Sequence, residues 1–237
     1  MPVVLAVQDT TLLDYTHHPA TTGLGPLDRG HQGFLVHSTL AFTSERLPLG
    51  LLAQQVWTRD PLQPGRRATR KLRPIAEQES QKWLTSLAAV AAQWSQCPAT
   101  RLLSVGDREA DVYDRFLLPR PDGVDVLVRA AWDRRVAGPQ PHLWDAVAQT
   151  PVVARTEVRV PKRGAPPART ATLQVRFCRV SLRPPKHRPQ ERLPQVTVWA
   201  VAAQEAAPPP DVPAVEWLLL TTWPVDTAAD ACERLDW

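Results

Sequence analysis

The sequence predicts an α/β fold built around a mixed sheet, and three observations support this prediction. In the first 132 residues, apolar runs typical of buried strands alternate with two segments of helical periodicity. The 25 prolines among 237 residues favour turns and edge strands over a helical bundle. After residue 132, short strand-like runs separated by proline-rich loops predict a region made of strands.

The first part of the chain reads as three strands, a helix, a strand, a helix and a strand. Each expected strand is a nearly continuous apolar run, as in a sheet covered on both faces. The strands are expected at 3–9, 32–42, 47–57, 101–107 and 124–132. The helices are expected at 77–97, where Trp and Leu recur at helical spacing, and at 109–118. A loop rich in Arg and Pro, 59–74, precedes the first helix.

The second part predicts four strands, of which TEVRVPKR is the first and EWLLLTTW the last, with LWDAVAQ as a short helix. Residues 226–237 then begin a helix that Asp226 or Thr227 can cap. The predicted organisation is a core at 1–132, a β-rich basic insertion at 133–224 and a helix start at 225–237.

Charge is distributed unevenly along the chain. Residues 133–200 carry 13 Lys and Arg against 4 Asp and Glu, whereas the rest carries 15 against 20. This asymmetry predicts one region that binds cations and another that binds a polyanion such as nucleic acid. The alternative is that the basic residues serve solubility alone.

Compartment signals favour the cytoplasm. No apolar stretch reaches about 18 residues, so no membrane helix is expected. The N-terminus has neither a basic region nor a cleavage site typical of a signal peptide. Three widely separated cysteines, Cys97, Cys178 and Cys232, predict neither a disulfide framework nor a zinc cluster.

Two apolar runs stop on a carboxylate, VVLAVQD at Asp9 and LLSVGD at Asp107. Neighbouring strands of one sheet can bring these carboxylates together. Two carboxylates about 4 Å apart repel by a few kcal/mol, which a bound cation relieves. Oxygen ligands suit Mg²⁺ or Mn²⁺, and two such ions can activate attack at phosphorus. The alternative is that each aspartate only caps the turn or helix that follows.

Seven segments resemble, in order, the blocks of bacterial DDE transposases of the insertion-sequence-four group. They are VQDTTLLDY, HQGFLVHSTL, GLLAQQVWTRD, ESQKW, VGDREADVYDRF, VLVRA and EWLLLTTWPV. The resemblance implies a ribonuclease-H-like (retroviral-integrase-like) core with an all-β insertion after its fifth strand. It also implies hydrolytic nicking and strand transfer at transposon ends, on double-stranded DNA, by proteins that act as homodimers in the bacterial cytoplasm.

The resemblance also assigns roles to single residues. Asp9 and Asp107 match the first two catalytic aspartates, which bind Mg²⁺ or Mn²⁺. Arg129 matches an arginine placed near the DNA, the alternative being an arginine paired with a carboxylate at a strand end. Trp217 matches a tryptophan that stacks near a flipped base, the alternative being a packed core tryptophan. Arg108, Glu109 and Asp111 are expected to support Asp107 without binding metal.

Departures from the family pattern bear on activity. The family's third acid is a glutamate on the helix after the insertion, and Glu233 lies roughly three turns too early to match it. The end-binding and dimerisation regions have no counterpart in the sequence. A transposase fragment that is inactive alone is therefore expected, with a non-catalytic DNA-binding remnant as the alternative. A ribonuclease-H-like nuclease is a further alternative, for which Glu77, Glu79 and Asp111 are the nearby acids.

Overall fold

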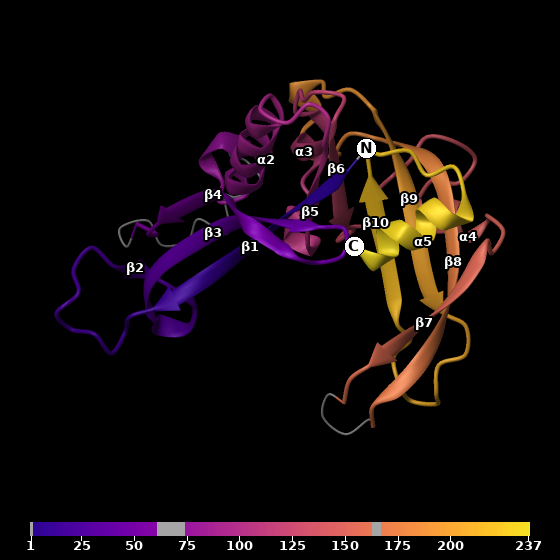
Figure 1. The fold of residues 1–237 in the computed structure, drawn as a ribbon, viewed down its shortest axis with the longest axis horizontal. Coiled ribbons are helices and arrows are strands. Elements are labelled where there is room, and N and C mark those ends of the chain that lie inside the picture. The colour runs from indigo at the N-terminus through magenta and orange to yellow at the C-terminus, as the bar shows by residue number, and fades with distance from the viewer. Residues whose placement is uncertain (1, 61–73, 163–166) are drawn as a thin grey trace. The chain divides into compact units, whose positions relative to one another are not determined.

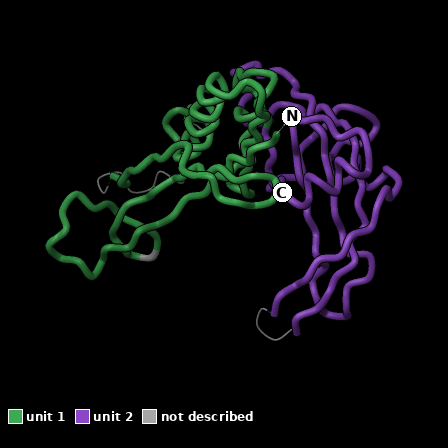
Figure 2. Tube along the Cα trace, viewed as in Figure 1, with its two compact units in different colours: residues 1–125 green, residues 126–237 purple. Residues whose placement is uncertain are grey.

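The computed structural model describes residues 2–60, 74–162 and 167–237, and these form two compact units (Figures 1 and 2). Unit 1 spans residues 1–125 and unit 2 spans residues 126–237. The predicted loop 59–74 lies almost wholly outside the described residues. Among the helices that are described, none combines the length and apolarity needed to cross a membrane. Helices and mostly antiparallel strands make this an α/β fold.

Unit 1 contains a mixed sheet. Its strands are β1 (Val3–Asp14), β2 (Gly25–Pro26), β3 (Gln32–Thr43), β4 (Pro48–Trp57) and β5 (Arg101–Gly106). β1 lies between β3, to which it is antiparallel, and β5, to which it is parallel. β4 and β2 pair with β3 in antiparallel fashion. The predicted α/β class with a mixed sheet is therefore confirmed.

One prediction about β1 was wrong, because Asp9 does not end the strand. The pairing of β1 with β3 continues to Asp14, which lies opposite Gly33. Polar residues from Thr10 onward weaken the apolar signal without interrupting the backbone ladder. Asp9 is therefore held inside a strand, which fixes its position more firmly than a loop would.

The helix α2 (Gln81–Trp94) covers one face of this sheet and packs against β1, β4 and β5. Burial along β3 alternates accordingly, because the residues at 33, 35, 37, 39 and 41 are buried and those between them are not. Trp83, Leu84, Leu87 and Val90 form the buried side of α2. The helix begins later than residue 77 because Gln78 has an extended backbone, which separates it from η3 (Ile75–Glu77).

The helix predicted at 109–118 divides into two pieces, η4 (Arg108–Ala110) and α3 (Tyr113–Leu117). Asp111 and Val112 leave the helical region of backbone conformation, with ψ angles of 65° and 127°. The break changes which side chains face inward, since Tyr113, Arg115 and Phe116 are buried on α3.

Unit 2 is an antiparallel sheet with the strand order β6–β10–β9–β8–β7. The strands are β6 (Val124–Arg129), β7 (Ala154–Val160), β8 (Arg169–Leu182), β9 (Val196–Glu205) and β10 (Glu216–Thr221). β6 is shorter than the predicted strand 124–132, and its pairing with β10 ends at Arg129. The boundary between the two compact units falls between residues 125 and 126, and the division of the chain at residue 132 into a core and an insertion stays a prediction.

Two helices accompany the sheet of unit 2. α4 (Leu143–Ala148) packs on β8 and β9, and α5 (Ala228–Asp236) packs on β7, β8 and β9 (Figure 1). Ala231 of α5 joins a buried cluster with Val175, Val201 and Val225. Thr227 begins α5 with a capping box, as the sequence predicts, because it exchanges hydrogen bonds with Asp230.

Candidate functional site

The parallel register of β1 and β5 relates Asp9 to Asp107. Every pairing from Val3 with Arg101 to Val7 with Val105 joins residues 98 positions apart. Asp9 and Asp107 are separated by the same 98 positions and follow two residues beyond the last pair. Neighbouring strands lie about 4.8 Å apart, so continuing this register sets the two aspartates at one level of the sheet.

Backbone alternation determines the face on which the two aspartates lie. A Cβ built on Gly106 would meet Ala110, Arg115 and Trp83, so Gly106 faces the helices. Asp107 comes next with an extended backbone and therefore points to the opposite face. Asp9 shares that face, because its neighbour Gln8 is buried on the helix side and bonds Ser104. Both aspartates are exposed.

Each carboxylate has one oxygen engaged by the backbone. Oδ1 of Asp9 accepts from the Thr10 amide at 2.7 Å, and Oδ1 of Asp107 accepts from the Glu109 amide at 2.8 Å. The second contact makes Asp107 the N-cap of η4, so Asp107 does cap the helix that follows it. Oδ2 of each aspartate makes no hydrogen bond to the described residues. Two exposed carboxylates with open oxygens fit a hard divalent cation such as Mg²⁺ or Mn²⁺.

A buried cation lies on the helix side of this pair. Arg115 is fully buried, and its Nη2 donates to Oγ and to the carbonyl oxygen of Ser104 at 2.9 and 3.3 Å. Its guanidinium lies 5.6 Å from the ring centre of Trp83. Burial lowers the pKa of Arg115 to about 9, while the negative charges of Asp107 and Asp111 oppose that fall. The group is therefore charged at neutral pH.

His37 lies in the same buried layer. Its Nδ1 is 2.9 Å from Oγ1 of Thr10, and its ring packs edge-on against Trp83 with centroids 4.5 Å apart. Burial, together with the positive charges of Lys82 and Arg115, lowers the pKa of His37 to about 4. The imidazole is consequently neutral at pH 7.

Lys82 contacts both the buried Trp83 and the exposed Glu109. Its side chain is 9% exposed, and Nζ lies 3.5 Å from Oε2 of Glu109. The same ammonium lies 5.8 and 5.6 Å from the ring centres of Trp57 and Trp83. Lys82 and Arg115 thus place two positive charges on the helix side of Asp9 and Asp107, which offsets the repulsion between these two carboxylates.

The other two predicted site residues belong to unit 2 and lie close together. Arg129 ends β6 and its Nη2 donates to the carbonyl oxygen of Glu216 at 3.3 Å. Trp217 follows Glu216 on β10 and packs, partly buried, against a cluster that contains Leu173 and Ala203. Both residues have structural contacts, and their proposed roles toward DNA stay predictions.

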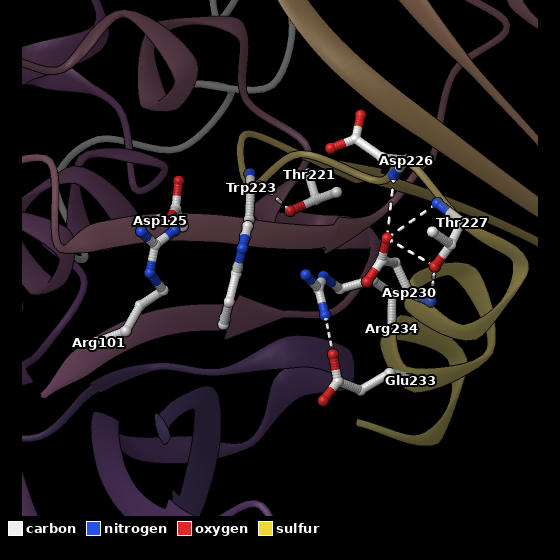
Figure 3. A network of polar contacts seen from close by, with 9 residues as sticks. All are labelled: Arg101, Asp125, Thr221, Trp223, Asp226, Thr227, Asp230, Glu233 and Arg234. Atoms are coloured by element: carbon white, nitrogen blue, oxygen red, sulfur yellow. Dashed lines mark hydrogen bonds and ion pairs between the residues drawn. The ribbon is translucent and has the colours of Figure 1, made fainter. Parts of the chain in front are cut away.

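Two of the further acids considered from the sequence, Glu79 and Glu233, have other partners. Both carboxylate oxygens of Glu79 accept from Arg59, at 2.5 and 3.1 Å. Glu233 pairs at 2.5 Å with Arg234, whose guanidinium lies 4.1 Å from the ring centre of Trp223 (Figure 3). The same guanidinium lies 4.6 Å from the ring centre of Trp237. Across residues 2–60, 74–162 and 167–237, no three His, Cys, Asp or Glu side chains gather into a group that could hold a metal ion.

Sequence reasoning missed the roles of His37, Lys82 and Arg115. A signal existed for Arg115, which follows Val112 by three residues and so occupies the apolar side of the expected helix. An arginine in that position must be buried or must distort the helix.

No model of a known protein family matches the sequence.

Proposed function

We propose that this chain supplies the first two metal-binding aspartates of a DDE-type transposase core with a ribonuclease-H-like arrangement. The observation that carries the proposal is the constant register of β1 and β5, which relates Asp9 to Asp107. The proposed partner is double-stranded DNA at transposon ends, and the proposed chemistry is hydrolysis and strand transfer at phosphodiesters. A cytoplasmic location belongs to the same proposal.

The roles of the residues follow from their positions. Asp9 and Asp107 would hold Mg²⁺ or Mn²⁺, which when bound polarises a phosphate and activates an attacking oxygen. The backbone amides of Thr10 and Glu109 fix one oxygen of each carboxylate and leave the other for the ion. The positive charges of Arg115 and Lys82 offset the repulsion between the two carboxylates before an ion binds.

Charge supports the DNA partner. Residues 133–200 have an excess of nine positive charges, and phosphate neutralisation by such a region favours nucleic-acid binding. Arg129, which pairs with Leu219 of β10, and Trp217, two residues before Leu219, are the proposed contacts to the backbone and to an extruded base.

The metal proposal is tested by iron-directed cleavage of the protein itself. Fe²⁺ replaces Mg²⁺, and with ascorbate and peroxide it cuts the polypeptide near its ligands. We expect cuts near residues 9 and 107 that excess Mg²⁺ suppresses. Asp9→Asn and Asp107→Asn should each abolish both cuts, because each variant removes half of the ligand pair.

Asp122→Asn is the matched control for this experiment. Asp122 is exposed and precedes Gly123, whose carbonyl oxygen accepts from the amide of Leu102 near the start of β5. It therefore lies at the end of β5 away from Asp107, and its variant should be cut like the wild type. A wild type that is not cut near residues 9 and 107 would contradict a shared ion. Asp9 and Asp107 variants that are cut like the wild type would contradict it as well.

A second candidate function is DNA binding without catalysis, which the basic charge of residues 133–200 favours by itself. It predicts duplex binding that needs no divalent ion and that persists in an Asp9→Asn/Asp107→Asn double variant. Iron-directed cuts at residues 9 and 107 would distinguish the metal site from this simpler function.

A further inference from the structure

A basic pocket in unit 2 has no role in the candidate metal site. Its cavity has a volume of about 460 Å³ and lies between Arg135 and the segment 183–195. Five cationic side chains line it, and the rest of the lining is three prolines, Leu193 and Gln195. The cations are Arg135, Arg183, Lys186, Arg188 and Arg192.

Backbone contacts hold the two ends of this pocket together. The amide of Arg183 donates to the carbonyl oxygen of Arg135 at 2.8 Å, and Val136 forms an isolated bridge with Leu182. Nη2 of Arg135 donates to the carbonyl oxygen of Pro184 at 3.2 Å. Arg135 and Arg183 are therefore fixed as neighbours by the fold and do not meet by chance on flexible side chains.

The rest of the segment is shaped by its own turns. Pro189 begins the short helix η5 (Pro189–Glu191), and Arg192 follows it with a left-handed backbone at φ 47°. The amide of Arg188 donates to the carbonyl oxygen of Pro185 at 3.1 Å. Prolines have a fixed φ, so less conformational entropy is lost when the segment orders around a ligand.

The charge of the pocket is poorly compensated. Glu191 pairs with Arg188 through two contacts of 2.5 Å, and none of the acidic side chains that the structure describes lines the cavity. Arg183, Lys186 and Arg192 are exposed. A cluster of like charges is raised in energy unless an anion joins it, and guanidinium groups bind phosphate oxygens in a bidentate manner.

The lining also indicates which part of a nucleic acid would enter. Among the residues that the structure describes, no aromatic side chain lines the cavity, so they offer no platform on which a base or nucleoside could stack. Several cations spread over one cavity exceed what a single phosphate requires. A duplex carries one negative charge per about 1.7 Å of its axis, which suits several cations in one pocket.

We propose that this pocket binds successive backbone phosphates of double-stranded DNA. The inference rests on the DNA partner of the proposed function and not on the metal site. Binding there is independent of base sequence and of divalent ions, because it uses charge alone. The same chemistry could be met by free polyphosphate, which the test separates from a duplex.

The test measures the affinity of a fluorescent 20-base-pair duplex by anisotropy between 50 and 300 mM KCl, without divalent ions. Arg183→Gln/Lys186→Gln removes two exposed pocket charges. Arg155→Gln/Arg159→Gln is the control, because it removes two exposed charges from β7 outside the pocket. Arg192→Asn is a separate pocket variant that tolerates the left-handed backbone. Circular dichroism and thermal melting confirm that each variant is folded.

We expect the pocket double variant to weaken binding about tenfold at 100 mM KCl and to reduce the slope of log K against log salt by about 2. Arg192→Asn should weaken it several-fold, and the β7 control should change it less than about twofold. Equal losses from pocket and control variants would overturn the inference, since charge would then act diffusely.

Two further outcomes concern the identity of the ligand. Tripolyphosphate should compete with the duplex only at concentrations far above the duplex dissociation constant. Tight tripolyphosphate binding without duplex binding would overturn the proposal in favour of a small phosphate ligand. A wild-type protein that binds no duplex overturns it as well, whereas the iron-directed cleavage reports on the metal site regardless of either result.

Discussion

Nη2 of Arg115 donates a 2.9 Å hydrogen bond to Oγ of Ser104, on the strand that leads directly into Asp107. Nε2 of Gln8 donates to the same hydroxyl at 2.6 Å, so Ser104 joins β1, β5 and α3. Nε and Nη1 of Arg115 are buried without a hydrogen-bond partner among the described residues. A buried cation with incomplete bonding is costly, and the negative charges of Asp107 and Asp111 offset part of that cost.

Of two replacements of Arg115, the chemically more conservative one should lower the stability of the protein more. Arg115→Met removes the buried charge and fills similar volume, whereas Arg115→Lys keeps a buried charge on a shorter side chain that loses the two bonds from Nη2 to Ser104. We expect the Lys variant to be less stable than the Met variant by about 1–3 kcal/mol, as measured by urea unfolding. A Met variant less stable than the Lys variant would show that attraction to Asp107 and Asp111 dominates.

Gly106 makes a sharp steric prediction beside the same arginine. A Cβ at this position would lie 2.5 Å from Cβ of Ala110 and 2.7 Å from Nη1 of Arg115. Gly106→Ala should therefore reduce the free energy of unfolding by about 1–3 kcal/mol. The double variant Gly106→Ala/Ala110→Gly removes the nearer contact and should recover part of the loss. Additive losses would contradict the contact.

His37 predicts a pH dependence of stability. Its pKa falls from 6.5 to about 4 on folding, so the unfolded chain binds more protons between these values. Stability therefore rises with pH from about 4 to 6.5, and is lost as the solution is acidified through that window. The full loss is about 3 kcal/mol, since one pKa unit corresponds to about 1.4 kcal/mol.

The measurement compares urea unfolding of the wild type and His37→Gln at several pH values between 4 and 7. Other acidic groups contribute to both proteins, so the difference between the two curves isolates His37. The wild type should lose more stability than the variant on acidification. Parallel curves would mean that His37 is protonated in the folded protein despite its burial and its neighbours Lys82 and Arg115.

The capping box of α5 predicts a local effect in unit 2 (Figure 3). Oγ1 of Thr227 accepts from the Asp230 amide at 3.1 Å, and Oδ2 of Asp230 accepts from the amides of Thr227 and Asp226 at 2.8 and 3.1 Å. Thr227→Ala should lower the free energy of unfolding by about 1 kcal/mol, and Thr227→Ser should restore most of it. Equal stability of the three proteins would contradict the cap.

Hydrophobic pattern predicted most elements of the sheet in unit 1, because β1, β3 and β5 each carry buried residues, and the apolar run of β4 was predicted although none of its residues is buried. It could not predict the break at Asp111, which depends on backbone angles that composition does not determine. It also assigned no role to Arg115, although the spacing of this residue from Val112 sets it on the apolar side of the expected helix. Proximity of Asp9 and Asp107 was expected from chemistry, but their common register is a property of the folded sheet.

The candidate DNA contacts show a different limit. A strand-end arginine and a strand tryptophan have the same sequence signature whether they bind a ligand or pack. The structure gives Arg129 a carbonyl partner and gives Trp217 a packing cluster, as a structural role requires. Neither contact prevents a role toward DNA, so only the binding of altered proteins can separate the two.

The last prediction concerns cleavage by the chain as it stands. Two carboxylates can hold one divalent ion, but two-ion phosphoryl transfer needs a second ion anchored and the phosphate held in line. Glu233 is the acid that the sequence offers for this purpose, yet its carboxylate is half-exposed and paired with Arg234. Losing several kcal/mol of transition-state stabilisation lowers the rate by orders of magnitude, since about 1.4 kcal/mol is a factor of ten. We therefore expect the wild type to nick supercoiled plasmid in Mg²⁺ or Mn²⁺ no faster than Asp107→Asn does. Glu233→Gln should be indistinguishable from both. Nicking that depends on Asp107 would contradict this expectation, and the rate of Glu233→Gln would then show whether Glu233 provides the third carboxylate.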